Sequence, residues 1–317
     1  MPYHFGPNYP AQTYVPHYYA EHTIDLGEVV MNYAVAGPET APALLLIPGQ
    51  TESWWGYEAA MRLLETNFRA YAVDLRGQGR STRTPGRYTL DNIGNDLVRF
   101  IQLAIGRPAI VAGLSSGGVL AAWLSAYSPP NLVRAAYYED PPLFSSEFNP
   151  AHGHSIRQGG MGDLFGLFSK YLGDQWSIGD WDAMVQAAPA ALPKSLARLA
   201  PRAGEPPQNM KEYDPEWGRA FQSGTITAGC DHARMLRNVK VPILFTHHFR
   251  KIDEATGVPM GAISDFQVGC VRDLIEAAGQ RFDYRSFPQM GHSMHGQDPA
   301  LYVATLQEWT RSLTPTG

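Results

Sequence analysis

The chain has 317 residues, enough to bury a substantial core as one large α/β domain or as a domain with an insertion. Its 25 basic and 30 acidic residues give a net charge of −5 without a long run of either sign, so the composition offers no attraction for nucleic acid or an anionic membrane. The two cysteines, Cys230 and Cys270, are too few for a disulfide framework and indicate a reducing compartment.

The N-terminal segment, residues 1–20, is rich in Pro and Tyr and has neither the basic start nor the apolar core of a signal peptide. No apolar run approaches the roughly 20 residues that cross a bilayer. We therefore expect a soluble, cytoplasmic protein. The segment is expected to form an irregular arm that packs on the body of the protein or on a second subunit of a homo-oligomer, with disorder as the alternative.

Strand and helix patterns alternate along most of the chain. Apolar runs that end at Pro or Gly predict buried strands, and apolar positions with a period near 3.6 predict helices, with Asp91 as the N-cap of one of them. The predicted order is a hairpin at 24–37, a strand at 43–50, a helix through 57–65, a strand at 69–82, a helix at 91–105, strand–turn–helix at 109–127, a strand at 132–144, a strand at 241–248, a helix at 264–279, a strand at 281–288 and a helix at 299–313.

The alternation stops between about residues 141 and 239, where aromatic residues occur among Gly, Pro and short helical patches. This predicts a helical cap inserted between the sixth and seventh strands of a mostly parallel central sheet flanked by helices. The core then comprises residues 21–140 and 240–317. Within the cap, Phe144 and Trp181 are the predicted lining of a binding site for a flat, apolar, aromatic molecule.

The stretch GLSSGG after the strand at 109–114 matches G-x-S-x-G, the motif of a nucleophile elbow. The flanking positions must be small because the turn presses them against neighbouring backbone. Gly113 and Gly117 flank Ser115 in this way, whereas Ser116 would have Leu114 on one side. Ser115 is therefore the predicted nucleophile, and the backbone N–H of Ser116 at the start of the following helix is a predicted oxyanion donor.

A catalytic base is expected after the last strand, where GHSMH places His292. His295 is close enough to be a substrate-contacting or supporting residue, or merely the polar start of a helix. The second oxyanion donor is predicted in the loop after residues 43–47, at the backbone N–H of Gln50, with Gly49 or Thr51 as alternatives.

The acid that orients the base can come from two places in the chain. One is the end of the strand after the elbow helix, at Glu139 or Asp140, and the other follows the strand at 241–248, at Asp253 or Asp265. We predict Glu139, because the segment HHFRKID lacks a glycine turn before its acid, whereas Glu139 ends a strand whose carboxyl end lies at the same sheet edge as the elbow.

The motifs LIPGQ, DLRGQGRS, GLSSGG and GHSMH, in this order, resemble the α/β-hydrolase superfamily across nearly the whole chain. The stretches QTESWWGYE, LDNIGNDLVRFI, LGDQWSIGDW and PQNMKEYDPEWGRAF are similar to the bacterial zearalenone lactonases. The resemblance implies an α/β-hydrolase fold and opening of the ester of a macrocyclic resorcylic acid lactone, without a metal or an organic cofactor. It also implies Ser115 as nucleophile, His292 as base and Glu139 as acid, the acid position used by fungal zearalenone hydrolases.

The sequence departs from the usual pattern at PGQ, which replaces the common His-Gly of the oxyanion loop. Three alternatives to a lactonase stay open. A broader carboxylesterase for aromatic or phthalate monoesters would use the same triad, and a carbon–carbon hydrolase or cofactor-free oxygenase would use the same fold. A non-catalytic ligand receptor is the alternative from a different class.

Overall fold

The computed structural model describes residues 15–148, 152–158, 160–173, 179–204, 206–251 and 260–313. Within this described part of the chain, eight strands form one sheet with the order β1-β2-β4-β3-β5-β6-β7-β8. The strands are β1 (Glu21–Asp25), β2 (Val30–Ala36), β3 (Ala43–Ile47), β4 (Arg69–Val73), β5 (Ala109–Leu114), β6 (Val133–Glu139), β7 (Ile243–His247) and β8 (Phe282–Ser286).

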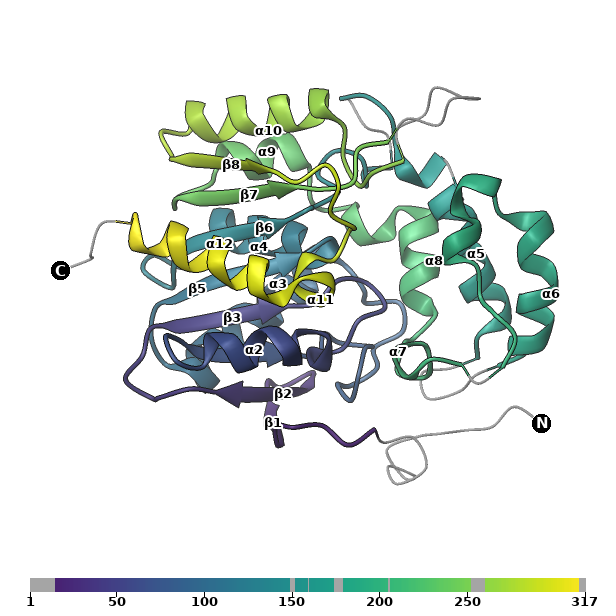
Figure 1. Cartoon of the computed structure of the whole chain (residues 1–317), viewed down its shortest axis with the longest axis horizontal. Coiled ribbons are helices and arrows are strands. Elements are labelled where there is room, and N and C mark those ends of the chain that lie inside the picture. The colour runs from purple at the N-terminus through teal and green to yellow at the C-terminus, as the bar shows by residue number, and fades with distance from the viewer. Residues whose placement is uncertain are drawn as a thin grey trace.

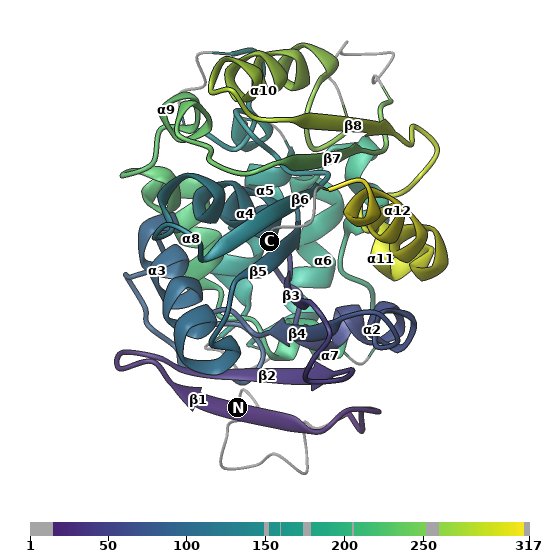
Figure 2. The same cartoon turned by 90° about the vertical axis from the view of Figure 1, so that its left-hand side faces the viewer.

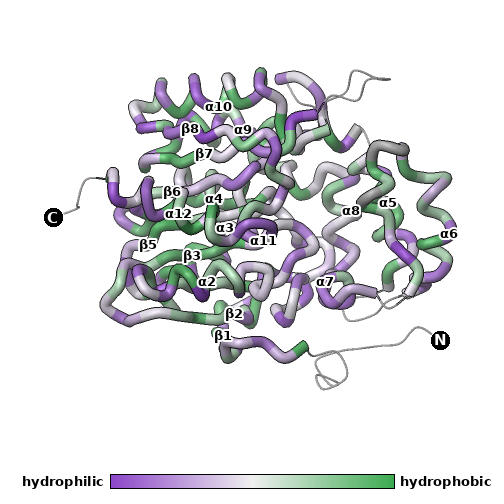
Figure 3. Tube along the Cα trace, viewed as in Figure 1, coloured by the Kyte–Doolittle hydropathy of each residue, from purple (hydrophilic) through white to green (hydrophobic). Residues whose placement is uncertain are grey.

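The first two strands form the predicted hairpin, which turns at Gly27 with a positive φ of 96° and pairs antiparallel to β4 through β2. From β4 to β8 every neighbouring pair is parallel. The central strands β3, β5 and β7 are buried along their whole length, whereas the edge strands β1 and β8 are not. Figure 3 shows the corresponding concentration of hydrophobic residues at the centre of the sheet. The predicted mostly parallel sheet is confirmed.

Helices cover both faces of the sheet, as Figure 2 shows. The helices α2, α11 and α12 pack on one face over apolar side chains of β3 and β5, and α3, α4, α9 and α10 pack on the other. Their bounds are η1 (Trp54–Tyr57), α2 (Glu58–Leu64), α3 (Leu90–Phe100) continued by a π-helical turn η2 (Ile101–Ile105), α4 (Ser116–Tyr127), α9 (His232–Arg237), α10 (Asp265–Ala277), α11 (Met294–Gln297) and α12 (Pro299–Arg311).

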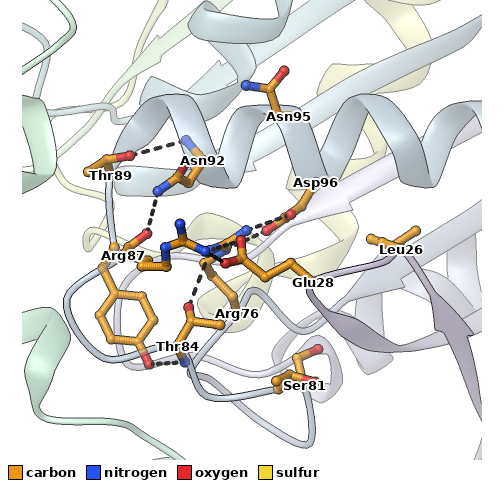
Figure 4. Close-up of polar contacts among 12 residues, drawn as sticks. Leu26, Glu28, Arg76, Ser81, Thr84, Arg87, Thr89, Asn92, Asn95 and Asp96 are labelled. Carbon is orange, nitrogen blue, oxygen red and sulfur yellow. Dashed lines mark hydrogen bonds and ion pairs between the residues drawn. The ribbon is translucent and has the colours of Figure 1, made fainter.

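The start of α3 differs from the prediction, because Thr89 and not Asp91 is its N-cap. The Thr89 side chain accepts a hydrogen bond from the backbone N–H of Asn92 at 3.1 Å, as Figure 4 shows. Asp91 lies inside the first turn and accepts a hydrogen bond from Trp123 Nε1. Both residues have side chains that can cap a helix, so the start of the helical backbone decides which one does.

A buried arginine anchors the loop after β4 to α3. Arg76 donates to both carboxylate oxygens of Asp96, at 2.6 and 2.7 Å, and its Nη1 lies 3.1 Å from Oε2 of Glu28 (Figure 4). Burial raises the pKa of the Asp96 carboxyl, and the hydrogen bonds and charge of Arg76 offset this only in part. The pair therefore places the loop rather than adding much net stability.

Between β6 and β7 the chain forms a helical layer beyond the carboxyl ends of the parallel strands (Figure 1). Trp217 Nε1 in this layer donates to the carbonyl of Arg76 at 2.7 Å, and Arg83 Nε in the core loop donates to buried Asp214 at 2.8 Å. The elements are η3 (Ile156–Gln158), α5 (Gly160–Tyr171), α6 (Trp181–Ala191), η4 (Lys194–Leu199), α7 (Gln208–Lys211), α8 (Glu216–Ser223) and η5 (Thr225–Thr227). Helix α9, inside the predicted cap range, packs against α4 and α10 of the core.

Among the residues that the structure describes, none forms a helix with both the length and the apolar content to cross a membrane.

Candidate active site

Ser115 lies at a sharp turn between β5 and α4. Its backbone has φ 55° and ψ −121°, a strained conformation for a residue with a side chain. The Ser115 N–H donates to the carbonyl of Glu139 at 2.9 Å, which ties the turn to the end of the neighbouring strand β6. The predicted elbow geometry is present at Ser115.

The two flanking glycines are required by the close approach of backbone. A Cβ on Gly113 would lie 2.1 Å from the carbonyl oxygen of Gly117, and a Cβ on Gly117 would lie 2.3 Å from that of Ile47. Neither contact is compatible with a side chain. This agrees with the steric argument that selects Ser115 over Ser116, because Leu114 could not occupy the position of Gly113.

His292 lies in the loop between β8 and α11, and its hydrogen-bond partner is not the residue we predicted. His292 Nδ1 is 2.7 Å from Oδ2 of Asp140, the residue that follows β6. The expectation that Glu139 orients His292 is therefore wrong for the structure in hand. Asp140 leaves the strand with φ 42°, which turns its side chain toward His292, whereas Glu139 is still part of the strand and points elsewhere.

The electrostatics of the Asp140–His292 pair favour a charged imidazole beside a charged carboxylate. Burial by itself raises the pKa of Asp140, but the hydrogen bond and charge of His292, together with His248, bring the pKa below its usual value. Burial by itself lowers the pKa of His292, but the hydrogen bond and charge of Asp140 bring it above its usual value. Such a histidine is a stronger base than an isolated imidazole.

The carboxylate of Glu139 is fully buried and binds the loop that carries His292 at another point. Its Oε1 accepts hydrogen bonds from the backbone N–H groups of Met294 at 2.6 Å and His295 at 3.1 Å, and its Oε2 lies 2.8 Å from His295 Nδ1. Glu139 and Asp140 thus hold the same loop from two sides.

Of the two alternative acids after β7, only Asp265 lies in the part of the chain that the structure describes, and its ion pairs there are with Arg250 and His247 rather than with His292. Asp265 is the first residue of α10, has a side chain that is 76% exposed and forms an ion pair with Arg250 at 2.6 Å. Asp253 lies outside the described residues.

A cavity of about 530 Å³ opens at the elbow, between the sheet edge and the helical layer. Ser115, Ser116, His292 and Gln50 lie at its core side, and Trp181 lies on its cap side, as predicted. Most of the remaining lining is apolar, including Leu90, Val119, Met161, Leu164, Phe165, Phe168, Met210, Phe221 and Ile226.

Phe144 is not among the described residues that line this cavity, so its predicted place there is wrong. The residue is completely buried, its backbone N–H donates to His232 Nδ1 at 2.9 Å, and its ring meets the ring of His152 edge-on at 4.5 Å. A positive φ of 64°, just after Pro141 and Pro142, directs the side chain into this contact. Its sequence context showed that it belongs to the cap junction but not which way it faces.

The loop after β3 brings the predicted second oxyanion donor to the cavity. Gln50 and Thr51 line it, and a Cβ on Gly49 would lie 3.4 Å from Cβ of Ser115, so this backbone runs beside the nucleophile. The side chain of Gln50 is engaged elsewhere, because its Nε2 donates to the hydroxyl of Tyr213 at 2.7 Å. Hence the backbone of Gln50, rather than its amide group, is the part available to a bound molecule.

Sequence reasoning did not identify the part played by His248. It is completely buried, its N–H donates to Oδ1 of Asp140 at 3.0 Å, and its Nδ1 lies 3.0 Å from the carbonyl oxygen of His292. His248 therefore connects the acid to the histidine loop. Its position at the carboxyl end of β7, next to β6, was the available signal.

Comparisons with known proteins agree with this geometry. A model of the Alpha/beta hydrolase family matches residues 44–305. The AB hydrolase superfamily protein YfhM of Bacillus subtilis (strain 168) is 29% identical over 114 residues, covering 35% of this chain and 40% of that protein. The 3-oxoadipate enol-lactonase 2 of Acinetobacter baylyi is 27% identical over 117 residues, covering 36% of this chain and 43% of the enzyme. The chain thus aligns with less than half the length of these relatives.

Among solved structures, a hydrolase from Pseudomonas aeruginosa PA01 superposes with a TM-score of 0.63 at 18% identity, covering 92% of this chain and 98% of that one. This likeness concerns the fold. The family model, by contrast, includes the elbow, Asp140 and His292 within the range that it matches. The predicted α/β-hydrolase fold is confirmed, and the chain belongs to the Alpha/beta hydrolase family.

Proposed function

We propose that this protein is a serine hydrolase that cleaves a carboxylic ester through an acyl-enzyme on Ser115, with a macrocyclic resorcylic acid lactone as substrate. The observation that carries the proposal is the shared cavity, which brings the strained Ser115 and the Asp140-bound His292 to one apolar site. A serine at an elbow beside a histidine held by a carboxylate is the arrangement that acyl transfer uses.

In the proposed mechanism His292 removes the proton of the Ser115 hydroxyl as the oxygen attacks the ester carbonyl. Asp140 holds the imidazole through Nδ1, so that Nε2 is left to accept the proton, and its charge stabilises the imidazolium. The alkoxide leaving group takes this proton, and the C–O bond of the ester breaks. Water activated by the same histidine then releases the carboxylic acid and restores Ser115.

The proposed oxyanion donors are the backbone N–H groups of Ser116 and Gln50. Ser116 begins α4, a helix of 12 residues, so its N–H belongs to the free first turn and lies at the positive end of the helix dipole. Gln50 lies on the same side of the cavity, in the loop beside Ser115. Loss of one such donor typically costs about 100-fold or more in kcat.

The substrate class rests on the chemistry of the cavity and on the resemblance of the cap sequence. The lining is largely apolar, and Trp181 offers an aromatic face to a phenolic ring, while its indole N–H is already donated to the carbonyl of Arg202 at 3.1 Å. A volume of about 530 Å³ accommodates a molecule of drug-like size.

The test is incubation of zearalenone with the wild type, Ser115→Ala and Ser116→Ala, followed by mass spectrometry of the products. We expect ring opening by the wild type and a loss of about 10⁴-fold or more in kcat for Ser115→Ala. Ser116→Ala is the matched control, because it keeps the backbone N–H and removes a buried hydroxyl that has no hydrogen-bond partner among the described residues. We expect it to stay within a few-fold of the wild type.

The outcomes separate the substrate from the mechanism. Turnover of simple aryl or phthalate monoesters with an untouched lactone would keep the serine mechanism and replace the substrate by that of a broader carboxylesterase. Full activity of Ser115→Ala would reject the mechanism itself.

A further inference from the structure

Next to the Asp140–His292 pair lies a second carboxylate–imidazole pair that the proposed reaction does not use. Glu139 and His295 are both completely buried, and the His295 ring stacks on Tyr57 with centroids 3.8 Å apart and planes at 18°. Burying two ionisable side chains is costly unless each finds a partner. Here Glu139 accepts three hydrogen bonds from the first two residues of α11, the helix that follows the His292 loop, and two of the three come from backbone N–H groups.

The other nitrogen of His295 faces a second carboxylate on a different loop. His295 Nε2 is 3.9 Å from Oε2 of Glu52, in the segment between β3 and η1. The same oxygen of Glu52 accepts the backbone N–H of Gly49 at 3.1 Å. Gly49 immediately precedes Gln50, the proposed oxyanion donor, and a Cβ on Gly49 would lie 3.4 Å from Cβ of Ser115. The imidazole is thus hydrogen-bonded to Glu139 through Nδ1, and its Nε2 lies 3.4 Å from Ser293 Oγ and within ion-pair distance of Glu52 on the oxyanion loop.

We propose that Glu139, His295 and Glu52 are positioning residues, a carboxylate–imidazole–carboxylate chain that fixes the loop of His292 and the loop of Gln50 relative to Ser115. The inference rests on the proposed function of the Ser115 site. These side chains act through hydrogen bonds to backbone. Glu139 accepts from the N–H groups of residues 294 and 295, and Glu52 accepts from the N–H of residue 49. Misplacing a reacting group by about 1 Å can cost 100-fold in rate, so the effect on catalysis is large.

The arrangement of Glu139, His295 and Glu52 depends on whether the imidazole of His295 is protonated. Burial by itself lowers the pKa of His295, but the charge and hydrogen bond of Glu139 and the charge of Glu52 bring it above its usual value. The other titratable groups that face the ring are Tyr57 on η1 and Tyr302 on α12. Burial and nearby acidic groups raise the pKa of both tyrosines well above the usual value, so both stay neutral.

A charged His295 between two carboxylates predicts a limit of activity at alkaline pH. As the pH rises through the pKa of His295, the imidazolium loses its proton and the attraction to Glu52 disappears. The acidic limb comes from His292, which must be neutral to act as a base. Loss of a proton from His292 therefore raises kcat and loss of a proton from His295 lowers it, so the two histidines act on the pH profile of kcat in opposite directions.

The decisive variant is Glu52→Gln, compared with Glu308→Gln as a matched control. Glu308 is a surface carboxylate on α12 that pairs with Arg285, so its loss leaves the site intact. Two readouts are measured across the pH range. The first is kcat and KM for hydrolysis of zearalenone, and the second is the rate at which a fluorescent phosphonate labels Ser115. For Glu52→Gln we expect kcat to fall about tenfold and both limbs of the pH profile to move to lower pH, because Glu52 raises the pKa of both histidines.

Glu139→Gln is expected to lower kcat by about 100-fold with a smaller change in KM. If that variant fails to fold, Glu52→Gln decides the question, since Glu52 is partly exposed and its amide keeps the shape of the side chain. An alkaline limb and a kcat that are unchanged in Glu52→Gln would overturn the inference while normal labelling of Ser115 keeps the proposed function. A wild type that is not labelled at Ser115 would overturn both.

Discussion

Two neighbouring residues at the end of β6 each hold a histidine of the same loop, yet only one pair lies on the cavity. In the cavity pair, Asp140 binds His292, whose side chain is 44% exposed. In the buried pair, Glu139 binds His295, and neither side chain has measurable exposure. The hydrogen-bond lengths differ by only 0.1 Å, at 2.7 and 2.8 Å.

The comparison teaches that access, rather than the strength of the pair, separates a catalytic role from a supporting one. A base must exchange protons with substrate and water, which His292 can do at the cavity wall. A histidine enclosed by Tyr57, Tyr302 and two carboxylates can only hold its neighbours in place. The roles that we propose for the same residue types therefore differ a few residues apart.

The largest effect on kcat is expected for a substitution in the cavity pair, and its result can contradict the comparison. We expect Asp140→Asn to lower kcat by about 10³- to 10⁴-fold, because the amide cannot stabilise the imidazolium and favours the wrong tautomer of His292. Loss of the Asp140 charge also lowers the pKa of His292, so the acidic limb of the pH profile moves to lower pH. Steady-state kinetics across the pH range measure both effects.

Glu139→Gln is the matched variant for that experiment, since it makes the same chemical change one residue earlier. A larger loss of kcat in Glu139→Gln than in Asp140→Asn, in folded proteins, would reverse the two assignments.

The buried ion pair of Asp96 and Arg76 lies away from the cavity. A substitution in this pair is therefore expected to change the stability of the fold and not catalysis. We expect Asp96→Asn to destabilise the fold by about 3 kcal/mol, because Arg76 keeps its charge in a buried position with Glu28 as the remaining carboxylate partner. Urea unfolding measures this change. The exposed Asp273→Asn, in the middle of α10, serves as control and should stay within about 0.5 kcal/mol of the wild type.

The folded fraction of Asp96→Asn should keep the wild-type pH profile. A shifted acidic or alkaline limb would show that this distant pair also influences the histidines.

The smallest expected effect concerns the cap side of the cavity. We expect Trp181→Ala to raise KM about tenfold with little change in kcat, because Trp181 lines the cavity on the cap side and is proposed to contact the substrate away from the reacting atoms. Kinetics on the lactone and on a small aliphatic ester measure the difference, and the small ester should be almost unaffected. A fall in kcat at constant KM would instead indicate a role for Trp181 in the transition state.

Much of the fold was predictable from the sequence because its signals are local. Apolar runs ended by Pro or Gly predict β3 and β5, and a period near 3.6 predicts α3. The choice of Ser115 is equally local, since Gly113 and Gly117 lie within the same turn and meet backbone at 2.1 and 2.3 Å. The region of His292 followed from its place after the last strand.

The tertiary structure alone decided which acid meets His292 and which aromatic residue meets the cavity. Glu139 and Asp140 are adjacent acidic residues at a strand end, and the two-residue alternation of a strand stops there. The positive φ of Asp140 and of Phe144 turns both side chains away from the direction that a regular strand would give, and local propensity does not encode such a turn for these residue types. Contacts between loops far apart in the chain, such as Glu52 with His295, depend on how the strands assemble. The sequence therefore determined which reactive side chains are present at this edge of the sheet, and the fold determined which of them meet one another.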